Sequence, residues 1–255
     1  MARQEGNDGN LTLSEHLEEL RHRLFIASLG AVAGTILAFI FHRRILGFLT
    51  EPAGDTQLIV TAVTENLGIA MKVSFMSGFI IALPLLVYQA VMFASPGLTP
   101  RERRYLFLSL PGITFTFVGG VAFGYYVLIP PAMSFLLGFN ADIATPFITI
   151  GNYINLTVSL LFWMGLVFET PVLMFILARL RLVRHTTFAR WRRLAVVMAF
   201  ILGAIITPTF DPINQSFVAV PIIFLYEMGI WLAWLARRGE KEESADKATA
   251  AEPGS

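Results

Sequence analysis

Apolar residues along this chain come in long blocks that short polar segments separate. Six blocks predict helices, at Leu24–Phe41, Leu67–Phe93, Tyr105–Ile129, Ile154–Ala178, Leu194–Ile206 and Ser216–Ala236. Because roughly 20 apolar residues are needed to cross ~30 Å of hydrocarbon, blocks of this kind are typical of membrane spans. The pattern therefore predicts an all-α membrane protein with six transmembrane helices.

The fifth block is the shortest, since its 13 residues would rise only ~20 Å as a helix. Its length is also compatible with a re-entrant segment. The stretch that follows, Thr207-Pro208-Thr209-Phe210-Asp211-Pro212, is typical of a tight turn, with Pro208 and Asp211 as its structural residues. We therefore expect short fifth and sixth helices that form a hairpin and thin the bilayer locally.

Prolines interrupt most of the predicted spans, and Pro84, Pro111, Pro171 and Pro221 lie inside blocks. Each removes a backbone donor and bends its helix. Bent helices predict a curved, concave body more than a straight bundle.

Glycine pairs at the spacing Gly-x-x-x-Gly occur at Gly30 with Gly34 and at Gly120 with Gly124. This spacing permits close helix approach in membranes. In Gly-rich spans such matches often arise by chance, so they predict no particular contact here.

Basic residues indicate the orientation. If the N-terminus is inside, 16 of the 19 Lys and Arg residues fall on the cytoplasmic side and only Arg43, Arg44 and Lys72 fall elsewhere. Cytoplasmic segments of membrane proteins carry such an excess. We therefore expect both termini in the cytoplasm.

The first 23 residues are polar and acidic, without the basic start and cleavage site of a signal peptide. The first block is therefore interpreted as a retained helix in a bacterial or archaeal plasma membrane. Residues 1–11 and 239–255 have the composition of disordered tails, which leaves residues 12–238 as the membrane domain.

Two kinds of segment connect the spans to water. Thr12–Arg23 is predicted to be an amphipathic helix, because Thr12 and Glu15 fit a capping box and leucines recur at helical spacing. The outer segments Arg43–Asn66 and Pro130–Tyr153 are long enough to form a small cap.

Several functions lose support from composition. The chain has no cysteine, and its four histidines lie outside the apolar blocks, which argues against a metal or haem site in the membrane. We expect no cofactor. No nucleotide-binding or hydrolase motif occurs, and no nucleophile–base constellation indicates an enzyme. The arginine-rich loop 179–193 is interpreted as a cytoplasmic anchor and not as a nucleic-acid surface.

Two carboxylates, Glu19 and Glu102, lie at the cytoplasmic mouths of the first and third spans. A pair of carboxylates at one depth is suited to bind guanidinium groups, which stay charged and present a planar fork. The alternative is local pairing, of Glu19 with Arg23 four residues later and of Glu102 with its flanking arginines.

Two further glutamates lie within apolar blocks, Glu169 in the fourth and Glu227 in the sixth. An ionisable residue at hydrocarbon depth is costly and indicates a functional site. The alternative for Glu169 is a protonated side chain bonded to backbone that Pro171 frees. For Glu227 we favour a structural partner.

The stretch His16-Leu-Glu-Glu-Leu-Arg-His-Arg-Leu24 resembles the N-terminal motif of the TatC family, the core subunit of the twin-arginine protein translocase. Five further stretches follow in the family's order: Pro84-Leu-Leu-Val-Tyr-Gln89, Glu102-Arg-Arg104, Phe168-Glu-Thr-Pro171, Ile206-Thr-Pro208 through Asp211, and Tyr226-Glu-Met-Gly229. The resemblance covers about Leu11 to Ala236. No single motif decides it, but six in order on the predicted topology are specific.

The resemblance implies a receptor that binds the paired arginines of signal peptides on folded cargo. It also implies assembly with further copies and with single-span TatA and TatB partners, and transport driven by the proton-motive force. The signal-binding site it implies comprises Glu19 and Glu102 with the neighbouring Arg21 and Arg103.

For the membrane interior, the resemblance implies an intramembrane glutamate at Glu169 and partner contacts at Thr207 and Gln215. The turn from Thr207 to Gln215 departs from the family pattern, since Thr209-Phe210 stands where a second proline is common.

A proton-coupled secondary transporter with Glu169 as proton carrier is the rival interpretation. Transporters of that kind usually show repeated halves and paired broken helices. The six predicted spans show no internal repeat.

Overall fold

The computed structural model describes residues 13–54, 57–94, 99–138, 147–207 and 211–250, without the side chains of 13, 94, 101 and 237–250. The helices of the first half are α1 (Leu13–Ile40), α2 (His42–Thr50), the 3-10 turn η1 (Glu51–Ala53), α3 (Glu65–Ala94), α4 (Pro100–Phe123), the π-helical turn η3 (Gly124–Leu128) and α5 (Ile129–Gly138). Those of the second half are α6 (Ile150–Phe168), α7 (Thr170–Arg179), α8 (His185–Arg190), α9 (Arg192–Ile206) and α10 (Pro212–Ala250). Two short strands, β1 (Leu58–Ile59) and β2 (Ile148–Thr149), complete the description.

Five described stretches of helix are long and apolar enough to cross a membrane: Ser14–Ile40, Glu65–Phe93, Glu102–Gly138, Ile150–Arg179 and Pro212–Ala236. The predicted fifth span corresponds to α9, whose 15 residues rise about 22 Å. A short fifth helix is therefore confirmed. The sixth was expected to be short as well, but α10 has 39 residues.

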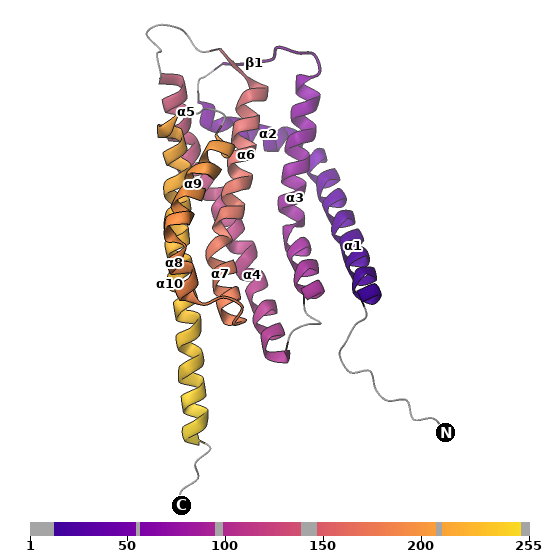
Figure 1. Cartoon of the computed structure of the whole chain (residues 1–255). Helices are drawn as coiled ribbons and strands as arrows, with labels where there is room; N and C mark the ends of the chain where they lie inside the picture. Colours follow the sequence, from indigo (N-terminus) through magenta and orange to yellow (C-terminus); the bar gives the residue numbers. More distant parts are fainter. Residues whose placement is uncertain (1–12, 55–56, 95–98, 139–146, 208–210, 251–255) are drawn as a thin grey trace, which may run out of the picture.

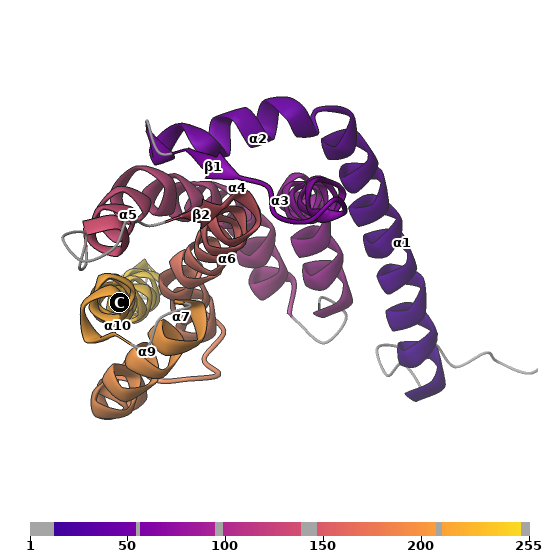
Figure 2. The ribbon, with the colours of Figure 1, turned by 90° about the horizontal axis from the view of Figure 1, so that it is seen from above.

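The helices follow an open arc, from α1 at one end through α3, α4 and α6 to α10 and α9 at the other (Figure 2). Each packs mainly on its neighbours in this order: α1 on α3, α4 on α6, and α7 and α9 on α10. The core lies around α6, where Tyr153, Ile154 and Met164 are almost completely buried. The arc agrees with the predicted concave body.

The third span differs from its prediction. It was expected to end at Ile129 before Pro130, yet helix continues through Pro130 and Pro131 to Gly138. The π-helical turn η3 lies directly before these prolines. A π turn changes the hydrogen-bond register locally. The helix can therefore continue even though the two prolines have no backbone N–H to donate. The outer segment predicted from Pro130 is shorter than expected, and α6 begins at Ile150.

The two outer segments meet in a small cap over the helix ends (Figure 1). β1 and β2 pair in parallel, with Leu58 opposite Ile148. Beside them, α2 lies across the bundle (Figure 2), and its terminal carbonyls accept bonds from tyrosines of the long helices, Tyr125 Oη to Phe48 O at 2.7 Å and Tyr153 Oη to Leu49 O at 2.9 Å. These bonds satisfy helix-end carbonyls that otherwise lack partners.

The predicted terminal segments have different outcomes. Thr12, of the expected capping box, and residues 1–11 lie outside the described residues, whereas α1 carries the expected helix from Leu13 directly into the membrane span. At the other end, the structure has helix to Ala250 where the composition predicted a tail from residue 239. Alanine, glutamate and lysine, which are frequent there, all have high helix propensity.

Glycines set the contact between α1 and α3. A Cβ on Gly34 would lie 2.5 Å from the carbonyl oxygen of Gly78, and one on Gly78 would lie 2.4 Å from the backbone of Thr35. Gly34 belongs to the first Gly-x-x-x-Gly match, from which no contact was predicted. Gly120 of the second match lies against α6, where an added Cβ would be 2.6 Å from Met164 O. Both matches therefore include a residue at a close helix approach.

Replacing Gly78 by alanine is expected to push α1 away from α3, because the new methyl group meets backbone and not a flexible side chain. Overpacking of this kind costs about 1–3 kcal/mol. The matched control is Gly68→Ala, in the same helix with open space around it, which should be neutral or stabilising through helix propensity. Thermal unfolding of the detergent-solubilised protein measures both variants, and equal midpoints would contradict the close contact.

Candidate functional site

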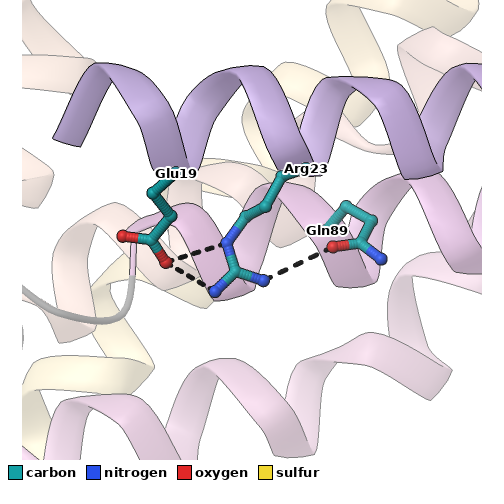
Figure 3. Close-up of polar contacts among 3 residues, drawn as sticks. All are labelled: Glu19, Arg23 and Gln89. Atoms are coloured by element: carbon teal, nitrogen blue, oxygen red, sulfur yellow. Dashed lines mark hydrogen bonds and ion pairs between the residues drawn. The ribbon is translucent and has the colours of Figure 1, made fainter. Parts of the chain in front are cut away.

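Glu19 lies near the beginning of α1 and holds the guanidinium of Arg23 (Figure 3). Arg23 Nε and Nη2 both donate to Glu19 Oε1, at 2.9 and 2.5 Å. Residues four apart lie on one face of a helix, so this is the local pairing that spacing allowed. The carboxylate side chain is 22% exposed, so it is half-buried at the helix end.

Gln89 of α3 completes this cluster. Its Oε1 accepts a bond from Arg23 Nη1 at 3.4 Å, which joins α1 to α3 (Figure 3). Sequence reasoning placed Gln89 in a motif but gave it no role. It is 8% exposed. The signal that could have identified it is a polar amide within an otherwise apolar span.

Glu102 lies in the first turn of α4, where it forms a capping box with Thr99. Glu102 Oε2 accepts from Thr99 N and Oγ1, both at 2.8 Å, and Thr99 Oγ1 accepts from Glu102 N at 3.4 Å. Pro100 at the first helical position reinforces this start. The carboxylate is therefore oriented by the helix cap, and a charge-assisted bond of this kind is comparatively strong.

α1 and α4 begin at the same end of the molecule (Figure 1), and both pack on α3. Glu19 and Glu102, which are close to these two beginnings, therefore lie at the same end. Gln89 ties this end of α3 to α1. The adjacent Tyr88 packs against Phe107 of α4, with ring centroids 6.1 Å apart. Consecutive residues of α3 thus connect the two glutamate-bearing helices.

The two arginines predicted for this site take different positions. Arg103 is exposed and lies 5.7 Å from the ring centroid of Phe107 on α4. Arg21 is exposed as well and lines an open depression on α1 with Glu18 and His22. Residues two positions apart in a helix are separated by about 200° around its axis. Arg21 is two positions from both Glu19 and Arg23, so it points away from the face that they share.

Glu169 occupies the break between α6 and α7, where it ends one helix and precedes the other. It is 7% exposed. Thr116 Oγ1 of α4 donates to Glu169 Oε1 at 2.9 Å, and the second oxygen is buried with no hydrogen-bond partner among the described residues. Pro171 is the second residue of α7, directly after the break, so the break and the carboxylate occur together. Sequence reasoning did not identify Thr116.

Glu227 of α10 forms an ion pair with Arg192, at the start of α9, with 2.9 Å between Oε2 and Nη2. Both side chains are substantially exposed. The pair joins the two helices of the hairpin.

The predicted partner-contact residues are both bonded within the hairpin. Thr207 is buried, and its Oγ1 donates to Gly203 O at 2.8 Å. Gln215 Nε2 of α10 donates to Phe200 O of α9 at 2.5 Å. Asp211 precedes α10, and its Oδ1 accepts from Asn214 N at 2.7 Å, so it caps that helix. Pro208 lies outside the described residues.

A family model described as TatC, Sec-independent protein translocase protein, matches residues 15–221. The chain belongs to the TatC family. The chain is similar to the Sec-independent protein translocase proteins TatC of Carboxydothermus hydrogenoformans, with 38% identity, and of Aquifex aeolicus, with 36%. These alignments cover 89% and 91% of this chain and 94% and 98% of the relatives.

A solved structure, the crystal structure of the twin arginine translocase receptor TatC, superposes with a TM-score of 0.79. It shares 35% identity and covers 88% of this chain and all of that chain. These findings confirm the TatC resemblance drawn from the motifs, the all-α membrane fold and the assignment to a Sec-independent protein translocase. They favour this function over a secondary transporter.

Thr116→Val is expected to lower stability, because it removes the hydroxyl that donates to the buried Glu169 carboxyl. Loss of a partner to a buried polar group costs about 1–3 kcal/mol. Thr114→Val is the matched control in the same helix, since Thr114 bonds only to Leu110 O of its own turn in the described contacts. Thermal midpoints in detergent that fall equally in both variants would show that the Thr116–Glu169 bond does not stabilise the fold.

Proposed function

We propose that this TatC-family chain is the receptor that binds twin-arginine signal peptides at the cytoplasmic face of a bacterial or archaeal plasma membrane. In this role it is a binding protein and not an enzyme. It would assemble with further copies and with TatA- and TatB-like single-span proteins, and export folded cargo at the expense of the proton-motive force.

One observation carries the proposal: the Glu19 carboxylate already holds a guanidinium with two donors on one oxygen. This contact is the chemistry that a signal-peptide arginine requires. Glu102, which the cap of α4 orients on the other side of α3, supplies a second carboxylate for the second arginine. Two separate carboxylates explain why the ligand would need a pair of arginines.

Binding at Glu19 would be an exchange, because an incoming arginine meets Arg23 already in place. Hydrogen bonds to charged groups contribute about 1.5–3 kcal/mol. Because the incoming arginine replaces bonds that Arg23 already makes, only part of this free energy favours binding. Gln89 already contacts Arg23 and would keep hold of it when Glu19 changes partner. The arginines therefore supply selectivity, while burial of the signal's apolar stretch along the arc, past Glu169, supplies most of the affinity.

Partner proteins are proposed to contact the α9–α10 hairpin near Thr207 and Gln215. Both side chains make bonds to α9 carbonyls. A partner helix with a polar residue would add to these bonds or replace them.

Glu19→Gln combined with Glu102→Gln is expected to weaken crosslinking of a twin-arginine peptide by about tenfold or more, which corresponds to a loss of ~1.4 kcal/mol. Glutamine keeps the shape of both side chains and retains a capping partner for Thr99. Photocrosslinking of a labelled peptide to the protein in membrane vesicles measures the effect. A twin-lysine peptide should bind weakly to the unaltered chain, because lysine lacks the planar fork.

The matched control is Glu18→Gln, which removes the same charge from an exposed neighbour of Glu19 on another face of α1. It should leave crosslinking unchanged. Unchanged crosslinking in the double variant, or an equal loss in Glu18→Gln, would refute the site.

The proposed orientation is testable because the chain contains no cysteine. Val63, in the outer cap, is 99% exposed, and Leu182, between α7 and α8, is 67% exposed. In intact cells a membrane-impermeant maleimide should label Val63→Cys and should label Leu182→Cys only after the membrane is opened. The reverse pattern would place both termini outside.

A further inference from the structure

A groove of about 390 Å³ lies between α8, the start of α9 and α10, and is lined by His185, Ala189, Arg192, Ile230, Trp231 and Trp234. We propose that this groove binds an anionic phospholipid of the inner leaflet, with its phosphate at Arg192 and His185 and an acyl chain along Ile230 and Trp231. The translocase assignment does not predict such a site.

The groove combines an apolar floor with a rim that carries Arg192 and His185. Trp231 is 71% exposed and Trp234 43% exposed, and tryptophan is enriched where membrane meets water. The apolar part of α10 ends at Ala236, so both tryptophans lie within its last two turns. An occupant has to be apolar along one side and anionic at its head, as an anionic phospholipid is.

Arg192 is held in place by an ion pair that leaves most of its N–H donors available. Glu227 binds one of its nitrogens, while the side chain remains 51% exposed. A guanidinium has five donors, so the others remain available to a phosphate beside Glu227. Across the groove, His185 lines the wall. Its Nδ1 is buried, so Nε2 is the ring nitrogen left to meet a phosphate.

The wall formed by α8 is fixed to α10. Tyr226 Oη donates to Phe188 O at 2.9 Å, and Phe188 packs on the buried alanines Ala233 and Ala236. A preformed groove lowers the ordering cost of binding. The remaining charges of this region are also favourable, because the loop 179–193 carries six arginines and no acidic residue.

Tryptophan quenching by brominated lipid tests the proposal on the full chain in vesicles. Trp163→Phe and Trp191→Phe leave the two groove tryptophans as the reporters. Brominated phosphatidylglycerol should quench them with an apparent affinity about fivefold above that of brominated phosphatidylcholine. Both lipids carry a phosphate, but only phosphatidylglycerol has a net negative charge, and its attraction to one cation near the surface contributes about 1 kcal/mol. Arg192→Gln with His185→Gln should abolish this preference, whereas Arg192→Lys should retain most of it.

Arg190→Gln is the matched control, since Arg190 is an exposed cation of α8 that does not line the groove. It should leave the preference unchanged, and an equal loss there would mean general attraction to the cationic surface and no site. Absence of any preference in the reporter chain would overturn the proposal. So would a single-span protein that co-purifies with the chain and is lost on Trp231→Ala. Native mass spectrometry of the unaltered chain, counting retained phosphatidylglycerol, provides the same decision if the reporter variants fail to fold.

Discussion

The structure depends on one constraint: in hydrocarbon, every backbone donor and acceptor must find its partner inside the protein. Along most of the chain, the hydrogen bonds within continuous helices satisfy this constraint. Where helices end, side chains supply the missing partners. Tyr125 and Tyr153 bond to the last carbonyls of α2, and Thr99 and Asp211 cap the starts of α4 and α10. The residues that we propose for function lie at or near helix ends, because that is where polar side chains are required.

Glu169 illustrates how the constraint and the proposed function meet. The α6–α7 break places the Glu169 carboxylate inside the apolar body. Thr116 of the neighbouring helix α4 donates a hydrogen bond to one of its two oxygens. The other carboxylate oxygen is buried without a hydrogen-bond partner among the described residues, beneath the path we propose for the signal's apolar stretch.

At the end of the molecule that we propose to face the cytoplasm, the charges suit both the proposed recognition and the proposed topology. Cations dominate this end, which is the arrangement that orients membrane proteins. Glu19 and Glu102 are acidic exceptions, and each is already engaged, one by Arg23 and one by Thr99. Engagement lowers the cost of holding a carboxylate there without a ligand, and a ligand that binds Glu19 has to replace the guanidinium of Arg23.

The family, the membrane class, the apolar spans and the positions of the acidic residues were all determined by the sequence alone. These features depend on local hydrophobicity, on charge counts and on short motifs, which are read without knowing how helices pack. The sequence also indicated the short α9, since the length of an apolar block limits the rise of its helix.

Only the tertiary structure decided which residues meet. Gln89 joins Arg23, and Thr116 joins Glu169, across separations of 66 and 53 residues that no local pattern specifies. Whether Gly34 and Gly78 touch depends on the rotation of two helices about their axes, and helix passes through Pro130 because a π turn precedes it. Rotation and register are set by the fit of side chains between neighbouring helices, and hydrophobicity alone does not encode that fit.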